Sequence, residues 1–65
     1  MATTFAEIRA LFLSLDLDLA DVQDNLDAAG TEDAKIGILI EWINHQAYDE
    51  EWKQSVDPTL LAKHM

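Results

Sequence analysis

Acidic side chains provide most of the chemistry that this chain could perform. Between residues 10 and 34 the sequence has seven acids and no lysine or arginine. Surface helices usually mix the two signs, because opposite charges three or four residues apart gain a few tenths of a kcal/mol. A surface of one sign is expected where it attracts a cationic partner. We therefore expect a protein with a basic surface to bind these side chains: Asp16, Asp18, Asp21, Asp24, Asp27, Glu32 and Asp33.

A metal site is the second chemistry to consider. Glu41, His45 and Asp49 are spaced by four, so on one continuous helix they would share a face and offer three ligands. We expect Asp49 to begin a new helix and His45 to be an ordinary surface histidine. The segment "DLDLAD" also lacks the glycine and the final glutamate of an EF-hand loop. The sequence predicts no metal.

The residues for catalysis are largely missing. The two serines, Ser14 and Ser55, have no nucleophile-elbow context, and there is no cysteine or glycine-rich phosphate loop. Thirteen acids in 65 residues make close carboxylate pairs common by chance. So short a chain also has little material for a water-excluding cavity. We expect a protein that is not an enzyme and that needs no cofactor.

Charge and length restrict the partners. The net charge is −9 while 49% of the residues are hydrophobic, which argues against disorder. Nucleic acid and anionic membranes would repel such a chain. No apolar run approaches the roughly 20 residues that span a bilayer, and "MATTFAEIRA" does not resemble a signal peptide. We expect a soluble cytoplasmic protein in which residues 1–65 form one small acidic domain, stabilised by oligomerisation or by another protein because it has no disulfide.

The chain carries helix signals from its beginning. Thr4 and Glu7 have the spacing of a capping box, which predicts a helix from Phe5. Gly30 stands where a helix would end, and Thr31 where the next would be capped. Apolar residues recur between these points in steps of three and four, as on the buried face of a helix: Phe5, Ile8, Phe12, Leu15, Leu19, Val22, Leu26 and Ala29.

The segment "SLDLDLAD" decides whether residues 5–29 form one helix or two. Asp18 favours a break, because aspartate caps helices more readily than it occupies their interiors. We predict helices near 5–14 and 19–29. Alternating leucines from Leu11 to Leu19 leave a mixed α/β alternative, in which they would form a strand that pairs with "KIGILI".

The segment "TEDAKIGILIEWINHQ" predicts a helix near 32–46 that is apolar on two sides. Ile38 and Trp42 lie opposite its main apolar face, which consists of Ile36, Leu39, Ile40, Ile43 and Ala47. We expect Ile38 and Trp42 to form an apolar interface in a homodimer, since tryptophan is enriched where binding energy concentrates. Both could equally be core. We include Trp52 in this interface, although its spacing to Val56 also suits a side chain docked on the core.

Two short helices are expected after residue 49. Asp49 can cap the first, and Asp57 followed by Pro58 predicts the start of the second. The predicted fold class is therefore all-α, a small bundle of three to five short helices, completed in one version by homodimerisation.

One family resemblance is present. The run "LADVQDNLDAAGTEDAKIGILIEWINHQ" resembles the middle helices of death-fold interaction domains, where an apolar helix with a tryptophan follows an acidic one. It covers under half of the chain and contains no diagnostic motif. The resemblance implies a protein interaction domain and assigns no functional residue.

Two functions follow from these observations. The first is an acidic regulator or inhibitor that covers the basic surface of another protein, with carboxylates where the phosphates of a nucleic acid would lie, as in phage-type inhibitors. The second is a helical assembly module, a homodimer or subunit adaptor, whose acids serve only solubility. We favour the first.

Overall fold

The computed structural model describes residues 1–65 and contains four α-helices and two short 3₁₀ helices. In chain order they are α1 (Phe5–Ser14), η1 (Leu19–Asp21), α2 (Gln23–Ala28), α3 (Glu32–Gln46), η2 (Glu51–Ser55) and α4 (Pro58–His64). No strand forms, so the all-α prediction is confirmed and the mixed α/β alternative is wrong. Extended pairing is limited to one parallel bridge between Ala2 and Val56.

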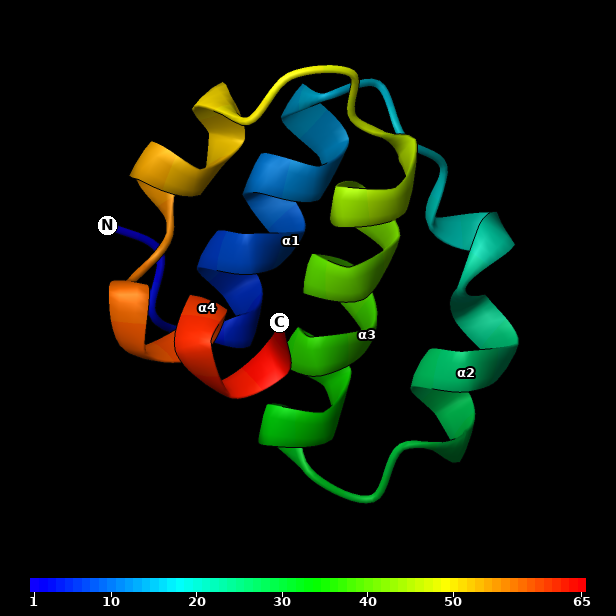
Figure 1. Cartoon of the computed structure of the whole chain (residues 1–65). Helices are drawn as coiled ribbons and strands as arrows, with labels where there is room; N and C mark the ends of the chain where they lie inside the picture. The colour runs from blue at the N-terminus through cyan, green and yellow to red at the C-terminus, as the bar shows by residue number, and fades with distance from the viewer.

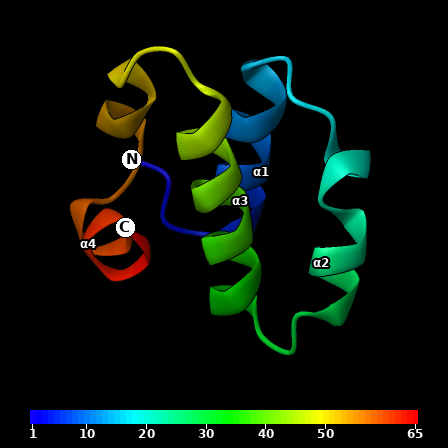
Figure 2. The same cartoon turned by 45° about the vertical axis from the view of Figure 1, so that its right-hand side comes forward.

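Helix α3 is central, and it contacts α1, α2 and α4. Figure 1 shows α1 and α3 side by side and running in the same direction, so that their C-terminal ends lie at one end of the molecule. Helix α2 returns along one side of this pair, and η2 and α4 lie on the other, as the turned view in Figure 2 also shows.

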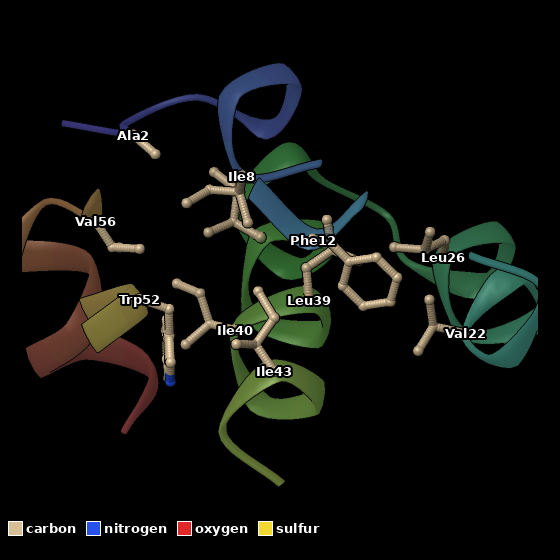
Figure 3. Packing of buried hydrophobic residues seen from close by; sticks show 11 residues of the cluster. Ala2, Ile8, Phe12, Val22, Leu26, Leu39, Ile40, Ile43, Trp52 and Val56 are labelled. Atoms are coloured by element: carbon tan, nitrogen blue, oxygen red, sulfur yellow. The ribbon is translucent and has the colours of Figure 1, made fainter. Parts of the chain in front are cut away.

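The core lies around the α1–α3 pair. Ile8 and Phe12 of α1 are fully buried, as are three consecutive apolar positions of the main α3 face, Leu39, Ile40 and Ile43. In Figure 3, Val22 and Leu26 reach this centre from the α2 side, while Trp52, Val56 and Ala2 complete it from the other side. The predicted α3 face is thus buried, with Ala47 at its end partly covered.

Helix α1 begins as its sequence predicts. The Thr4 hydroxyl accepts a hydrogen bond from the Glu7 amide, and the Glu7 carboxylate accepts from the Thr3 and Thr4 amides. A contact between distant residues adds to this cap, because Glu32 at the start of α3 accepts from the Phe5 amide at 3.0 Å. The free N–H groups of one helix are therefore satisfied partly by its neighbour.

Helix α1 ends in a tight turn at Asp16. This residue has φ 62°, the left-handed conformation that glycine usually adopts after a helix. Its amide donates to the Leu13 carbonyl at 3.1 Å. The turn separates the apolar residues of α1 from those that begin at Leu19. It also leaves Leu15, which we expected on the buried face, 37% exposed.

The predicted helix 19–29 is divided in two, which corrects the sequence interpretation. Asp18 caps as expected, with its carboxylate accepting from the Ala20 amide. The first turn is 3₁₀, however, and Val22 (φ −121°) separates it from α2. Since residues three apart eclipse in a 3₁₀ turn, Leu19 and Val22 can both face the core. Helix α2 ends at Ala28, and Gly30 follows without a positive φ.

Both helices of the C-terminal third begin with short local hydrogen bonds. Asp57 caps α4 through the Thr59 amide, as predicted, with Pro58 at the first helical position. Asp49 accepts from the Glu51 amide, although Glu50 is the N-cap residue and the helix is 3₁₀. The bridge to Ala2 ties the start of the chain to the residues just before α4.

Helix α4 docks on α3 at a glycine. A Cβ built on Gly37 would lie 2.7 Å from Nδ1 of His64 and 2.9 Å from its Cε1. Gly37 is buried in the interior of α3, where glycine lowers helix stability by about 1 kcal/mol relative to alanine. The His64 ring therefore occupies the space that a side chain at position 37 would fill.

A double-mutant cycle tests this docking. In a His64→Ala background, Gly37→Ala should raise the free energy of unfolding by about 1 kcal/mol through helix propensity. With His64 present the same substitution should gain less or destabilise, because the ring must move. Urea unfolding followed by circular dichroism gives all four values. Equal effects of Gly37→Ala in both backgrounds would show that the ring does not depend on the glycine.

A second prediction concerns the turn after α1. Asp16→Gly should raise the free energy of unfolding by about 0.5–1 kcal/mol, because a left-handed conformation strains a residue that has a Cβ. Asp16→Ala removes the same charge but keeps the strain, so it is the matched control. Thermal unfolding that ranks the alanine variant at or above the glycine variant would contradict the assignment.

Candidate functional site

The aspartates of α2 and the turn before it form an exposed face without counter-ions. Asp21, Asp24 and Asp27 are exposed, and none of them has a lysine, arginine or histidine within 4.0 Å. Asp27 accepts only from the Gln23 amide group, at 2.8 Å. No base of the chain therefore neutralises their charge. We call these three side chains the α2 acids.

Asp16 and Asp18 extend this acidic surface to the end of the molecule where α1 terminates. Both are exposed and neither forms an ion pair. Asp18 has one oxygen committed to the Ala20 amide, while Asp16 is placed by its left-handed backbone. The structure thus keeps five of the seven acids predicted as a binding face free of basic neighbours.

The other two acids of the predicted face take part in contacts within the fold. Glu32 binds the Phe5 amide. Asp33 lies 3.0 Å from the Lys63 ammonium and 3.3 Å from Nε2 of His64, so it links α3 to α4. The hydrogen bond from Lys63 is the main cause that lowers the pKa of Asp33. Sequence spacing could not reveal these partners, which lie about 30 residues away along the chain.

Helix α2 is anchored by few side chains. Only Leu26 is buried within it, together with Val22 just before it. Both point towards Phe12 in Figure 3, while Asp24 and Asp27 share the exposed side of this short helix with other polar and small residues. Because the apolar side is narrow, most of the helix surface is exposed to water, and its only charges are negative.

The residues predicted as an apolar interface are placed differently from one another. Trp52 is 5% exposed and belongs to the core. Ile38 and Trp42 are partly buried against the core and line a shallow cavity of about 340 Å³ between α2 and α3, with Val22, Asn25, Glu41 and His45. The Trp42 Nε1 is buried there without a hydrogen-bond partner. Covering by α2 accounts for much of the second apolar side of α3.

The metal spacing considered from the sequence does not continue along α3. The helix ends at Gln46, and Ala47 adopts an extended conformation. Asp49 therefore leaves the helical face that carries Glu41 and His45. Acidic and histidine side chains nowhere gather in a group of three that could hold a metal ion.

One surface feature was missed from the sequence. Tyr48 is fully exposed, and it borders a groove at the end of the molecule where α1 and α3 terminate. The same groove contains Leu15 and Leu17, from the turn that follows α1. The signal available in the sequence was an aromatic residue next to an acidic run, "YDEE", beyond the expected end of a helix.

Comparison of the chain with family models, with curated proteins and with solved structures finds no match. None of the helices combines the length and the apolar character that crossing a membrane requires.

Two acids with lowered pKa values, Glu7 and Asp33, predict how the stability of the fold depends on pH. Hydrogen bonds, first of all from the Thr3 amide, lower the pKa of Glu7 in the folded chain. A lowered pKa means that Glu7 stabilises the fold above its unfolded pKa of about 4.3, and that this contribution disappears as the pH falls through the folded value. The pKa of Asp33 is also lowered, mainly by the hydrogen bond from Lys63, so its contribution to stability depends on pH in the same direction.

Glu7→Gln tests this dependence, since glutamine also suits a capping box but does not titrate. The variant should unfold at lower urea concentration than the wild type at pH 7, and the difference should shrink as the pH falls below 4. Asp33→Asn should behave alike. A difference that stays constant from pH 7 to pH 2 would contradict a role for these charges.

Proposed function

We propose that this chain is a non-enzymatic acidic binding protein whose α2 face covers a basic surface of another protein and thereby regulates or inhibits it. The observation that carries the proposal is a set of five exposed aspartates, none of which forms an ion pair with a base: Asp16, Asp18, Asp21, Asp24 and Asp27. Their carboxylates would take the places that nucleic-acid phosphates occupy on the partner.

The distribution of the bases supports this proposal. Lys53 pairs with Glu50 at 2.8 Å, and Lys63 pairs with Asp33. Lys35 lies over the Phe5 ring, 5.7 Å from its centre. Since the remaining base, Arg9, is on α1, no cation belongs to α2 or to the turn before it. No lysine or arginine of this segment therefore opposes the charge of its acids, which favours fast encounter with a cationic surface.

The assembly module is a second proposal, favoured by one observation. Ile38 and Trp42 are still partly accessible in the cavity beside α2, and the buried Trp42 Nε1 lacks an acceptor. A second copy could cover this site if α2 shifted. The homodimer remains a prediction, and sedimentation of the wild type and of Trp42→Asp tests it.

The binding proposal is tested by neutralising the α2 acids. Asp21→Asn, Asp24→Asn and Asp27→Asn together leave the core intact and raise the net charge from −9 by three. Partners captured from the native host lysate on the wild-type chain should associate severalfold more slowly with this variant, and with weaker salt dependence, because exposed charges act mainly on encounter.

A charge-matched control separates location from net charge. Lysines at the exposed positions Ala10, Gln54 and Ala62 raise the net charge by the same three units and leave α2 unchanged. This control should retain most of the wild-type association rate. If the two variants slow association equally, only net charge matters. If neither changes rate or salt slope, the proposed function fails.

A further inference from the structure

The end of the molecule at which α1 and α3 both terminate contains an apolar groove. Its volume is about 370 Å³, within the range of roughly 300–1,000 Å³ typical of ligand pockets. The apolar lining comes from three separate segments, the turn after α1, the residues after α3, and η2: Leu15, Leu17, Ala47, Tyr48 and Trp52. In Figure 1 the loop after α1 and the loop after α3 both lie at the top of the view, and residues of both line the groove.

The backbone gives this end a negative potential. Each helix C-terminus carries roughly half an elementary negative charge, and parallel packing places two of them together. The carbonyls of Asn44, His45 and Gln46 accept no hydrogen bond from a following backbone amide. No base lies in the last turn of α1, and α3 offers only His45 there. The helix ends thus have no lysine or arginine of their own.

Acidic side chains add to this potential instead of opposing it. Asp16 lies two residues after the end of α1, and Asp49 lines the groove three residues after the end of α3. At the opposite end, Glu7 and Glu32 lie at helix N-termini, where a carboxylate is stabilising. Acids beside helix C-termini are unfavourable in the free chain. One base follows in this segment, Lys53, but its ammonium is paired with Glu50 and lies 5.9 Å from the centre of the Trp52 ring.

Tyr48 contributes nothing to the core. Its side chain is fully exposed, and Leu15 is 37% exposed beside the same groove. Tyrosine is enriched among the residues that dominate binding energy at protein interfaces. The groove thus combines apolar lining, an available ring and an uncompensated negative potential.

We propose that this groove docks a basic amphipathic segment of the partner, with one large apolar side chain in the groove and lysine or arginine on either side. The inference rests on the proposed function and specifies its second contact. The flanking cations would meet Asp16, Asp49 and the carbonyl ends of α1 and α3. A second copy of this chain fits less well, because it carries four bases against thirteen acids.

The test uses two short synthetic peptides and the full chain. One peptide has leucines flanked by arginines, and the other has serine in place of each leucine. In amide NMR titrations the leucine peptide should shift residues 15–17, residues 46–49 and the Trp52 indole. The serine peptide should bind about tenfold more weakly, the effect of losing one buried aliphatic side chain.

Matched variants locate the contact. Leu15→Ser and Tyr48→Ala should each weaken binding of the leucine peptide about tenfold. Leu13→Ser removes a leucine of similar exposure, 42%, outside the groove, and Tyr48→Phe keeps the ring. Both controls should stay within about twofold of the wild type, since neither removes apolar contact area in the groove.

The outcomes separate this inference from the proposed function. Equal binding of both peptides, with shifts centred on residues 21–27, would overturn the groove and leave the acidic binding protein standing. Concentration-dependent shifts at the groove without peptide would show a second copy as its occupant, which also overturns the inference. Binding at the groove together with an unchanged partner rate in the α2 variant would keep the groove and remove the proposed function.

Discussion

The parallel packing of α1 against α3 is the contact on which the rest of the structure depends. Ile8 and Phe12 meet Leu39, Ile40 and Ile43, and these five side chains are completely removed from water. Every other element adds to this pair from one side or the other. Because the pair takes up most of the large apolar side chains, α2 is left with Val22 and Leu26 as its buried contacts. The rest of α2, with Asp24 and Asp27, remains exposed to water.

Parallel packing also sorts the acids by their electrostatic environment. At the N-terminal ends of α1 and α3, Glu7, Glu32 and Asp33 bind backbone amides or the bases of α4, so their charge stabilises the fold. At the C-terminal ends and along α2, carboxylates such as Asp16 and Asp24 have no such partner. The acids that give the chain its net charge of −9 therefore differ in their effect on the stability of the fold. One group of acids stabilises the chain, and the other remains available for a cation from outside.

Local signals in the sequence predict much of this fold, since capping depends on residues three or four apart. Thr4 with Glu7, and Asp57 with Pro58, begin their helices where expected, and α3 has its predicted limits. The left-handed Asp16 and the 3₁₀ turn before α2 were not predicted, because each depends on the path of the chain between α1 and α2 and not on the spacing of residues three or four apart. The sequence shows the run of acids between residues 10 and 34 directly. It does not show their division into free and engaged acids, because the partners of Glu32 and Asp33 come from α1 and α4.

Amide hydrogen exchange tests the central claim, that a weakly anchored acidic helix on a stable α1–α3 pair is the binding face. Helices with few buried contacts open at low free energy, so the amides of α2 should exchange faster than those of α1 and α3 in the free chain. In complex with a captured partner, residues 21–28 should become strongly protected while α4 stays unchanged. Protection confined to α3 and α4, with α2 exchanging as in the free chain, would contradict the account.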